Sequence, residues 1–154
     1  SGPEGASTAS LELVKMYQEN GLPGVGVCPV ETDEIGNYGV VGISNGMAVE
    51  IVEKPSLSEA PSEYVLCGRY LLPENTGKIL DEYPISEFGE MQSISLLNHL
   101  IGHGGLQAVK IDHMEMYDSG DPVSWLKSQI DHGLRREDIS VDLLEWLSDR
   151  LYRT

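Results

Sequence analysis

The chain has 154 residues, of which 40% are hydrophobic, and its 10 basic and 25 acidic residues give a formal net charge of −15. This acidity argues against partners such as nucleic acids or anionic membranes, because both require a basic surface. No apolar run approaches the roughly 18 residues that a membrane-spanning helix needs. The two cysteines, Cys28 and Cys67, lack C-x-x-C spacing, which favours buried thiols in a cytoplasmic protein over a disulfide scaffold.

The first half of the chain predicts one helix followed by strands. Residues 1–10 are expected to form a loose N-terminal segment, and residues 11–154 a single α/β domain. Leu11, Val14 and Met16–Tyr17 have helical spacing, and Gly21 should end this helix. Strand-like runs follow at 25–30, 38–43, 49–53 and 64–72, with a hairpin turn at 44–46 and a polar loop at 56–63.

The second half predicts helices with one further strand between them. Helices are expected at 74–83, at 91–101 with a stop at Gly102, at 122–130, and at 139–151 with Asp138 or Ser140 as the cap. A strand is expected at 106–111, and a short extended piece at 115–117 leads into a turn at 118–120. Strands that alternate with helices predict an α/β sandwich with a mixed sheet.

Glu53 and Lys54 stand side by side at the end of a predicted strand. Neighbouring side chains on a strand point to opposite faces, but both can reach one ligand where the strand end opens into a crevice. The carboxylate would accept hydrogen bonds from sugar hydroxyls, and the ammonium would hold a phosphate. A solvated strand terminus is the alternative interpretation of this pair.

Two glycines could let a ligand lie against the backbone. Gly39 precedes an apolar strand, where a tight turn is the alternative explanation. Gly68 lies inside a predicted strand, which it weakens unless something approaches closely or the strand bulges there.

Asp118 and the histidines are the candidate metal ligands. Asp118 lies between a strand-like piece and a helix, where α/β proteins often bind ligands and Mg²⁺, although a turn or helix cap is the alternative. His99 and His103 are four residues apart and share a predicted helix face, but no acidic residue accompanies them, which argues against zinc.

The order of short motifs resembles one known family. The chain reads N-Y-G-V-V at 37–41, V-E-K-P at 52–55, G-R-Y at 68–70, G-E-M-Q at 89–92 and D-S-G at 118–120. This succession, from about Leu11 to Trp146, resembles the C-terminal half of bacterial UTP–glucose-1-phosphate uridylyltransferases, in the sugar-nucleotide pyrophosphorylase family of nucleotidyltransferases. The resemblance implies a Rossmann-like α/β/α sandwich that lacks its N-terminal nucleotide-binding half.

The resemblance also implies a role for each matching residue. Gly39 corresponds to a glycine that lies against the sugar, and Glu53 to a carboxylate that binds the glucose hydroxyls. Lys54 corresponds to a lysine that holds the sugar phosphate, and Gly68 lies in a strand that lines the pocket. Asp118 corresponds to the second of two aspartates that ligate Mg²⁺, so Mg²⁺ is the implied cofactor and a sugar phosphate or UDP-glucose the implied ligand.

The sequence also departs from the family pattern. It contains no G-x-G-T-R nucleotide loop, and the first metal-binding aspartate has no counterpart. We therefore expect a nucleotidyltransferase-like protein that is inactive alone, or a non-catalytic binding or regulatory module. Missing strands would leave an unpaired sheet edge and apolar surface, which a homodimer or a separate partner chain would cover.

Overall fold

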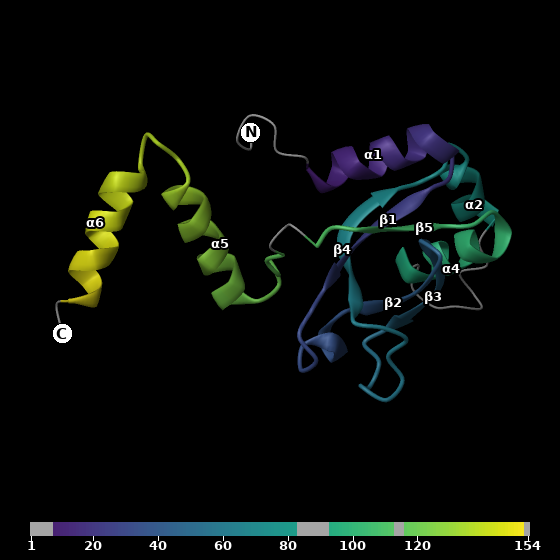
Figure 1. Cartoon of the computed structure of the whole chain (residues 1–154), viewed down its shortest axis with the longest axis horizontal. Helices are drawn as coiled ribbons and strands as arrows, with labels where there is room; N and C mark the ends of the chain where they lie inside the picture. The colour runs from purple at the N-terminus through teal and green to yellow at the C-terminus, as the bar shows by residue number, and fades with distance from the viewer. Residues whose placement is uncertain (1–7, 83–92, 113–115, 153–154) are drawn as a thin grey trace. The chain divides into compact units, whose positions relative to one another are not determined.

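The computed structural model describes residues 8–82, 93–112 and 116–152. Contacts group the chain into two compact units, Ser1–Met114 and Glu115–Thr154 (Figure 1). Residues 1–7 and the G-E-M-Q motif at 89–92 lie outside the described residues. The single domain expected over residues 11–154 stays a prediction.

The first unit contains the strands and most of the helices. Its helices are α1 (Ala9–Asn20), the short 3₁₀ helix η1 (Ile35–Asn37), α2 (Thr76–Glu82) and α4 (Ser93–His103). Its strands are β1 (Gly24–Pro29), β2 (Gly39–Ser44), β3 (Met47–Glu53), β4 (Tyr64–Leu71) and β5 (Gln107–Lys110). Each of these strands overlaps a run predicted from the sequence, as does each α-helix of this unit.

The sheet is mixed, as predicted. β1 runs parallel to β5 and antiparallel to β4, while β2 and β3 form an antiparallel hairpin. Single residue pairs join these two ladders, Val40 with Val65 and Met47 with Gln107, so the strands close into a barrel in the order β1-β4-β2-β3-β5.

This closure differs from the open sheet that a Rossmann-like sandwich implies. The expectation of an unpaired strand edge is wrong for the described strands, because each of them has a neighbour on both sides. The β2–β3 hairpin reaches β4 on one side and β5 on the other, which leaves no open end to the sheet.

The hairpin turn is confirmed at Asn45-Gly46. Both residues have positive φ, 50° and 78°, and they alone separate β2 from β3. Two positive φ angles in a two-residue loop are typical of a type I′ turn, whose twist matches that of the flanking strands. The turn sets the pairing of Ser44 with Met47, and a one-residue shift of the register between Gly42 and Ile43 then brings Gly39 opposite Glu53.

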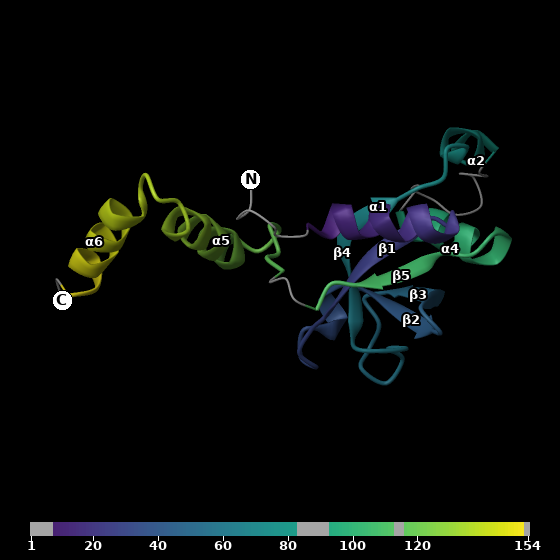
Figure 2. The same ribbon diagram turned by 45° about the horizontal axis from the view of Figure 1, so that its top comes forward.

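Helix α1 begins and ends with clear caps. Thr8 Oγ1 accepts a hydrogen bond from Leu11 N at 3.2 Å, and Gly21 ends the helix with a φ of 72°. The helix lies along β1 and β4 (Figures 1 and 2). Leu13, 3% exposed, faces the sheet, whereas Leu11, Val14 and Tyr17 are exposed. The predicted apolar face is therefore not the buried face.

Helix α4 packs against β3 and completes the core. The Asn98 side chain binds both backbone groups of Ile51, accepting from its N–H and donating to its carbonyl oxygen, each at 3.1 Å. The helix runs past Gly102, so the predicted stop is wrong. Gly105 terminates the helix instead: its φ is 91°, and its N–H donates to the Leu100 carbonyl oxygen.

The second unit contains α5 (Pro122–Leu134) and α6 (Ser140–Leu151). Asp121 caps α5 by accepting a hydrogen bond from Ser124 N at 2.6 Å. The two helices meet at Gly133, where an added Cβ would lie 2.5 Å from Leu143 Cδ2. The predicted cap of α6 is wrong: Ile139 holds that position, and the Asp138 carboxylate binds Arg136 instead.

Within the described residues, no helix is both long enough and apolar enough to cross a membrane.

Candidate functional site

Four of the predicted site residues lie in the first unit. Gly39 starts β2 and Glu53 ends β3, and the register of the hairpin pairs these two residues directly. Lys54 follows Glu53, and Gly68 lies in β4, the strand that β2 meets on its other side. The fold therefore brings Gly39 and Glu53 together by strand pairing, with Lys54 next in the chain.

The Glu53 carboxylate lies against the bare backbone of Gly39. A Cβ on Gly39 would lie 3.2 Å from Glu53 Oε2, 3.2 Å from Leu66 Cδ1 and 3.1 Å from Ile94 Cδ1. Gly39 is buried, whereas Glu53 is exposed, so the carboxylate remains open to solvent. A side chain at position 39 would press on all three groups, so the missing Cβ is what lets Glu53, Leu66 and Ile94 pack against this backbone.

Lys54 adopts a backbone conformation that lysine rarely takes. Its φ is 44°, and its N–H donates to the Tyr38 carbonyl oxygen at 3.0 Å. The expectation that Glu53 and Lys54 alternate along a strand is therefore wrong, because β3 ends at Glu53 and the chain turns at Lys54. A non-glycine residue with positive φ costs roughly 1–2 kcal/mol, and such strain is concentrated at functional sites.

Gly68 forms a bulge in β4. Val25 pairs with Tyr70 and Val27 pairs with Leu66, so three residues of β4 lie opposite Gly26 alone. Gly68 has a φ of 70°, and nothing lies within 4 Å of an added Cβ. The bulge was one of the two alternatives for Gly68, and its left-handed backbone explains the glycine without any close approach by another part of the protein.

Tyr70, two residues after Gly68, is a further candidate because Glu53 is among the charged groups that act on its hydroxyl. Burial raises the pKa of its hydroxyl above the ordinary value, a hydrogen bond with Ser93 lowers it, and the neighbouring Cys67 and Glu53 groups raise it further. The hydroxyl thus stays protonated at neutral pH, with the Glu53 carboxylate among its charged neighbours. Tyr70 belongs to the G-R-Y motif at 68–70, but the side chains around it could not be predicted, because they depend on the bulge at Gly68.

Asp118 lies in the second unit and does not follow a strand. The piece expected to be extended is irregular where it is described, at Met116 and Tyr117, and β5 ends much earlier, at Lys110. Asp118 Oδ1 accepts a hydrogen bond from Gly120 N at 2.7 Å, which is the turn that formed the alternative interpretation.

A complete metal centre is not found among the described residues. No group of three or more His, Cys, Asp or Glu side chains converges in that part of the chain. His99 and His103 do share a helix face, as predicted, and their rings stack with centroids 4.0 Å apart. Two imidazoles without a third ligand do not make a zinc site.

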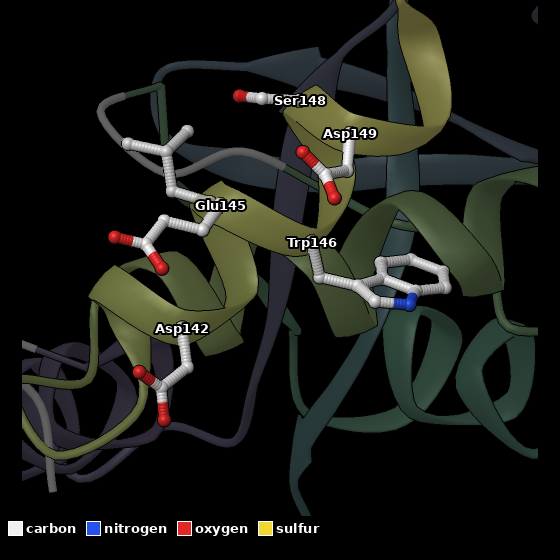
Figure 3. Close-up of a pocket in the computed structure, with 6 residues that line it drawn as sticks. Asp142, Glu145, Trp146, Ser148 and Asp149 are labelled. Carbon is white, nitrogen blue, oxygen red and sulfur yellow. The ribbon is translucent and has the colours of Figure 1, made fainter. Parts of the chain in front are cut away.

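A shallow hollow lies on α6. It is lined by Asp142, Leu144, Glu145, Trp146, Ser148 and Asp149. Figure 3 shows Trp146 and Glu145 directed to different sides of this single helix. Because all the lining side chains come from one exposed helix, they do not converge on a common point, and no chemistry is assigned to this hollow.

The comparisons with known proteins agree on one family. The nucleotidyl transferase family model matches residues 6–131. The chain is similar to a UTP–glucose-1-phosphate uridylyltransferase of Haemophilus influenzae, at 26% identity over 89% of this chain and 49% of the relative. It thus spans about half the length of the curated relatives it matches.

Solved structures show the same fold. A UDP-glucose pyrophosphorylase from Acinetobacter baumannii superposes with a TM-score of 0.82, at 21% identity over 95% of this chain and 52% of that one. A UDP-glucose pyrophosphorylase complexed with UDP-glucose gives a TM-score of 0.73, at 22% identity over 86% of this chain and 52% of that one. By its sequence match and its fold, the chain belongs to the nucleotidyl transferase family.

Proposed function

We propose that the first unit binds the sugar and phosphate of glucose 1-phosphate or UDP-glucose, and that the chain corresponds to the C-terminal half of a UTP–glucose-1-phosphate uridylyltransferase. One observation carries this proposal: the Glu53 carboxylate is open to solvent and lies directly against the side-chain-free backbone of Gly39. The names of the relatives, and the relative solved with UDP-glucose, support the choice of ligand.

Each group would contribute a different contact. Glu53 accepts hydrogen bonds from sugar hydroxyls, and a charged acceptor of this kind contributes about 1.5–3 kcal/mol. Lys54 holds the phosphate as a point charge. Gly39 lets the Glu53 carboxylate lie against β2, and the bulge at Gly68 shapes the facing strand. Tyr70 keeps its proton and can donate a hydrogen bond beside Glu53.

We further propose that this chain does not catalyse nucleotidyl transfer alone. In the proposed reaction a phosphate oxygen of glucose 1-phosphate attacks the α-phosphorus of UTP, and pyrophosphate leaves. This chain would bind and orient the attacking phosphate, which lowers the entropic part of the barrier. The printed sequence holds no G-x-G-T-R loop to bind the triphosphate.

The described residues do not fit a complete Mg²⁺ site. Asp118 supplies one carboxylate, and no second or third acidic ligand converges on it among the described residues. We therefore assign no step of the reaction to the metal. The role of Asp118 as one Mg²⁺ ligand remains part of the proposal.

A second candidate function rests on the exposed apolar side chains of the second unit. Large apolar residues are exposed on and beside α5 and α6: Val123, Trp125, Leu126, Ile139, Val141, Leu144, Trp146 and Leu151. Surfaces of this kind mark contacts with other proteins. The chain would then act as a non-catalytic module that forms a homodimer or pairs with a separate enzyme chain, through these helices rather than through a sheet edge.

Calorimetric titration tests both candidates, after light scattering has fixed the mass of the particle. The first proposal predicts saturable binding of glucose 1-phosphate and UDP-glucose that is lost in Lys54→Ala and kept in Lys15→Ala, an exposed lysine on α1. Asp118→Asn should weaken the binding of Mg²⁺ to the chain and leave the metal-free affinity for the sugar phosphate unchanged. Absence of binding by a folded dimer would favour the second candidate.

A further inference from the structure

The two cysteines lie on neighbouring strands with their side chains on the same face. In the register of β1 with β4, Cys28 pairs with Val65, and Cys67 stands two residues further along β4. Side chains alternate along a strand, so Val65 and Cys67 point to the face that Cys28 occupies. Strand register therefore places the two thiols diagonally across one strand pair.

A glycine makes room for Cys67 to lean towards β1. A Cβ on Gly26, two residues before Cys28, would lie 2.7 Å from Cys67 Sγ and 3.2 Å from Ile111 Cδ1. Cys28 Sγ lies 3.8 Å from the backbone oxygen of the same Ile111. Gly26 thus leaves the room that Cys67 Sγ occupies on this face, and the Cys67 thiol is among the groups that act on the Cys28 thiol.

The two thiols differ in how easily a reagent reaches them. Both are free, Cys28 is 4% exposed, and Cys67 is half-buried. The prediction of two buried thiols is therefore right for Cys28 and wrong for Cys67. Burial, followed by the neighbouring Cys67 thiol, raises the pKa of Cys28 to about 12, so Cys28 keeps its proton at neutral pH. An oxidant from solvent would meet Cys67 first.

We propose that Cys28 and Cys67 form a redox modification site, at which a hydroperoxide converts the pair into a disulfide bond between β1 and β4. The O–O bond of hydrogen peroxide breaks as Cys67 Sγ takes one oxygen, which gives a sulfenic acid and one water. Cys28 Sγ then attacks this sulfur, the S–O bond breaks, and the hydroxyl leaves with the Cys28 proton as a second water. Two thiols are oxidised and one peroxide is reduced.

The bond would tie the two strands together immediately before the Gly68 bulge. It would also restrict the unfolded chain between residues 28 and 67, which stabilises the folded state. Because Cys28 must release its proton during the attack, closure of the bond should be the slow step and should accelerate as the pH rises towards the pKa of Cys28.

Mass spectrometry of the whole chain treated with hydrogen peroxide tests this proposal. We expect an intramolecular Cys28–Cys67 link that dithiothreitol reverses and that raises the denaturant concentration at the unfolding midpoint. Cys28→Ala should let Cys67 stop at the sulfenic or sulfinic acid, and Cys67→Ser should leave Cys28 reduced. A wild-type chain in which Cys67 reaches the sulfinic acid while Cys28 stays reduced, or in which only intermolecular links form, would overturn the proposal.

Discussion

Replacement of Lys54 should separate stability from ligand binding, because its backbone is strained. At a φ of 44° the Cβ atom crowds the following carbonyl, at a cost of roughly 1–2 kcal/mol. Pro55 follows, and proline also restricts the conformation of the residue before it. The strain belongs to the backbone, so it does not depend on the lysine charge.

Three variants of Lys54 distinguish the effect of backbone strain on stability from the effect of the lysine charge on ligand binding. Lys54→Asn places a residue that tolerates this conformation, and we expect a gain of about 0.5–1 kcal/mol in the free energy of unfolding. Lys54→Gly relieves the same strain but adds about 0.5–1 kcal/mol of unfolded-state entropy, so its net gain is smaller. Lys54→Ala keeps a Cβ, and we expect a change within about 0.5 kcal/mol.

Urea unfolding followed by circular dichroism measures the stability of each variant, and calorimetry measures its affinity for glucose 1-phosphate. All three variants should bind the ligand about 10–150-fold more weakly, because each loses one charged contact worth roughly 1.5–3 kcal/mol. If Lys54→Asn and Lys54→Gly unfold at lower urea concentrations than Lys54→Ala, the backbone at this position is not strained and the reasoning is refuted.

Three further predictions concern other parts of the chain. Gly68→Ala should cost about 1–2 kcal/mol and Gly68→Asn less, because the φ of 70° and not a steric clash demands the glycine, and urea unfolding checks the order. Gly133→Ala should destabilise the packing of α5 on α6, because the added methyl group would clash with Leu143. In a Leu143→Ala background the clash is gone, and the same substitution should be stabilising because alanine favours the helix more than glycine does. Thermal unfolding that shows no such reversal of sign would contradict this. The pKa of Cys28 is raised from 9.0 to about 12, so the folded state holds this proton more tightly than the unfolded state does. The contribution of this thiol to the free energy of unfolding should therefore be complete below pH 9 and fall between pH 9 and 12, by at most about 1.4 kcal/mol per pH unit. The Cys28→Ala variant should lack this fall when unfolding is measured as a function of pH.

Local chemistry made much of the first unit predictable. Asn45-Gly46 could be assigned to the hairpin turn because few residues accept two positive φ angles, and that turn sets the pairing of Ser44 with Met47. The pairing of Gly39 with Glu53 depends in addition on the register shift between Gly42 and Ile43, which the sequence pattern did not reveal. The bulge at Gly68 was likewise one of two alternatives that the strand pattern left open.

Features that depend on tertiary contacts escaped the sequence. Glu53 and Lys54 do not alternate along a strand, because the chain turns after Glu53 and the Lys54 N–H donates to the carbonyl oxygen of Tyr38 on the other arm of the hairpin. Closure of the sheet rests on single pairs between distant strands, and no local pattern encodes such pairs. Helix α4 runs past Gly102 because glycine inside a helix costs only about 1 kcal/mol, which the packing of Leu96, Leu97 and Leu100 outweighs.

The most direct test of the central claim compares glucose with glucose 1-phosphate in the wild-type chain, in Glu53→Gln and in Lys54→Ala. If Glu53 binds the sugar and Lys54 binds the phosphate, Glu53→Gln should weaken both ligands, whereas Lys54→Ala should weaken only glucose 1-phosphate. Equal affinity of all three proteins for glucose 1-phosphate, measured by calorimetry on chains with matching circular dichroism spectra, would contradict the proposed sugar-phosphate site.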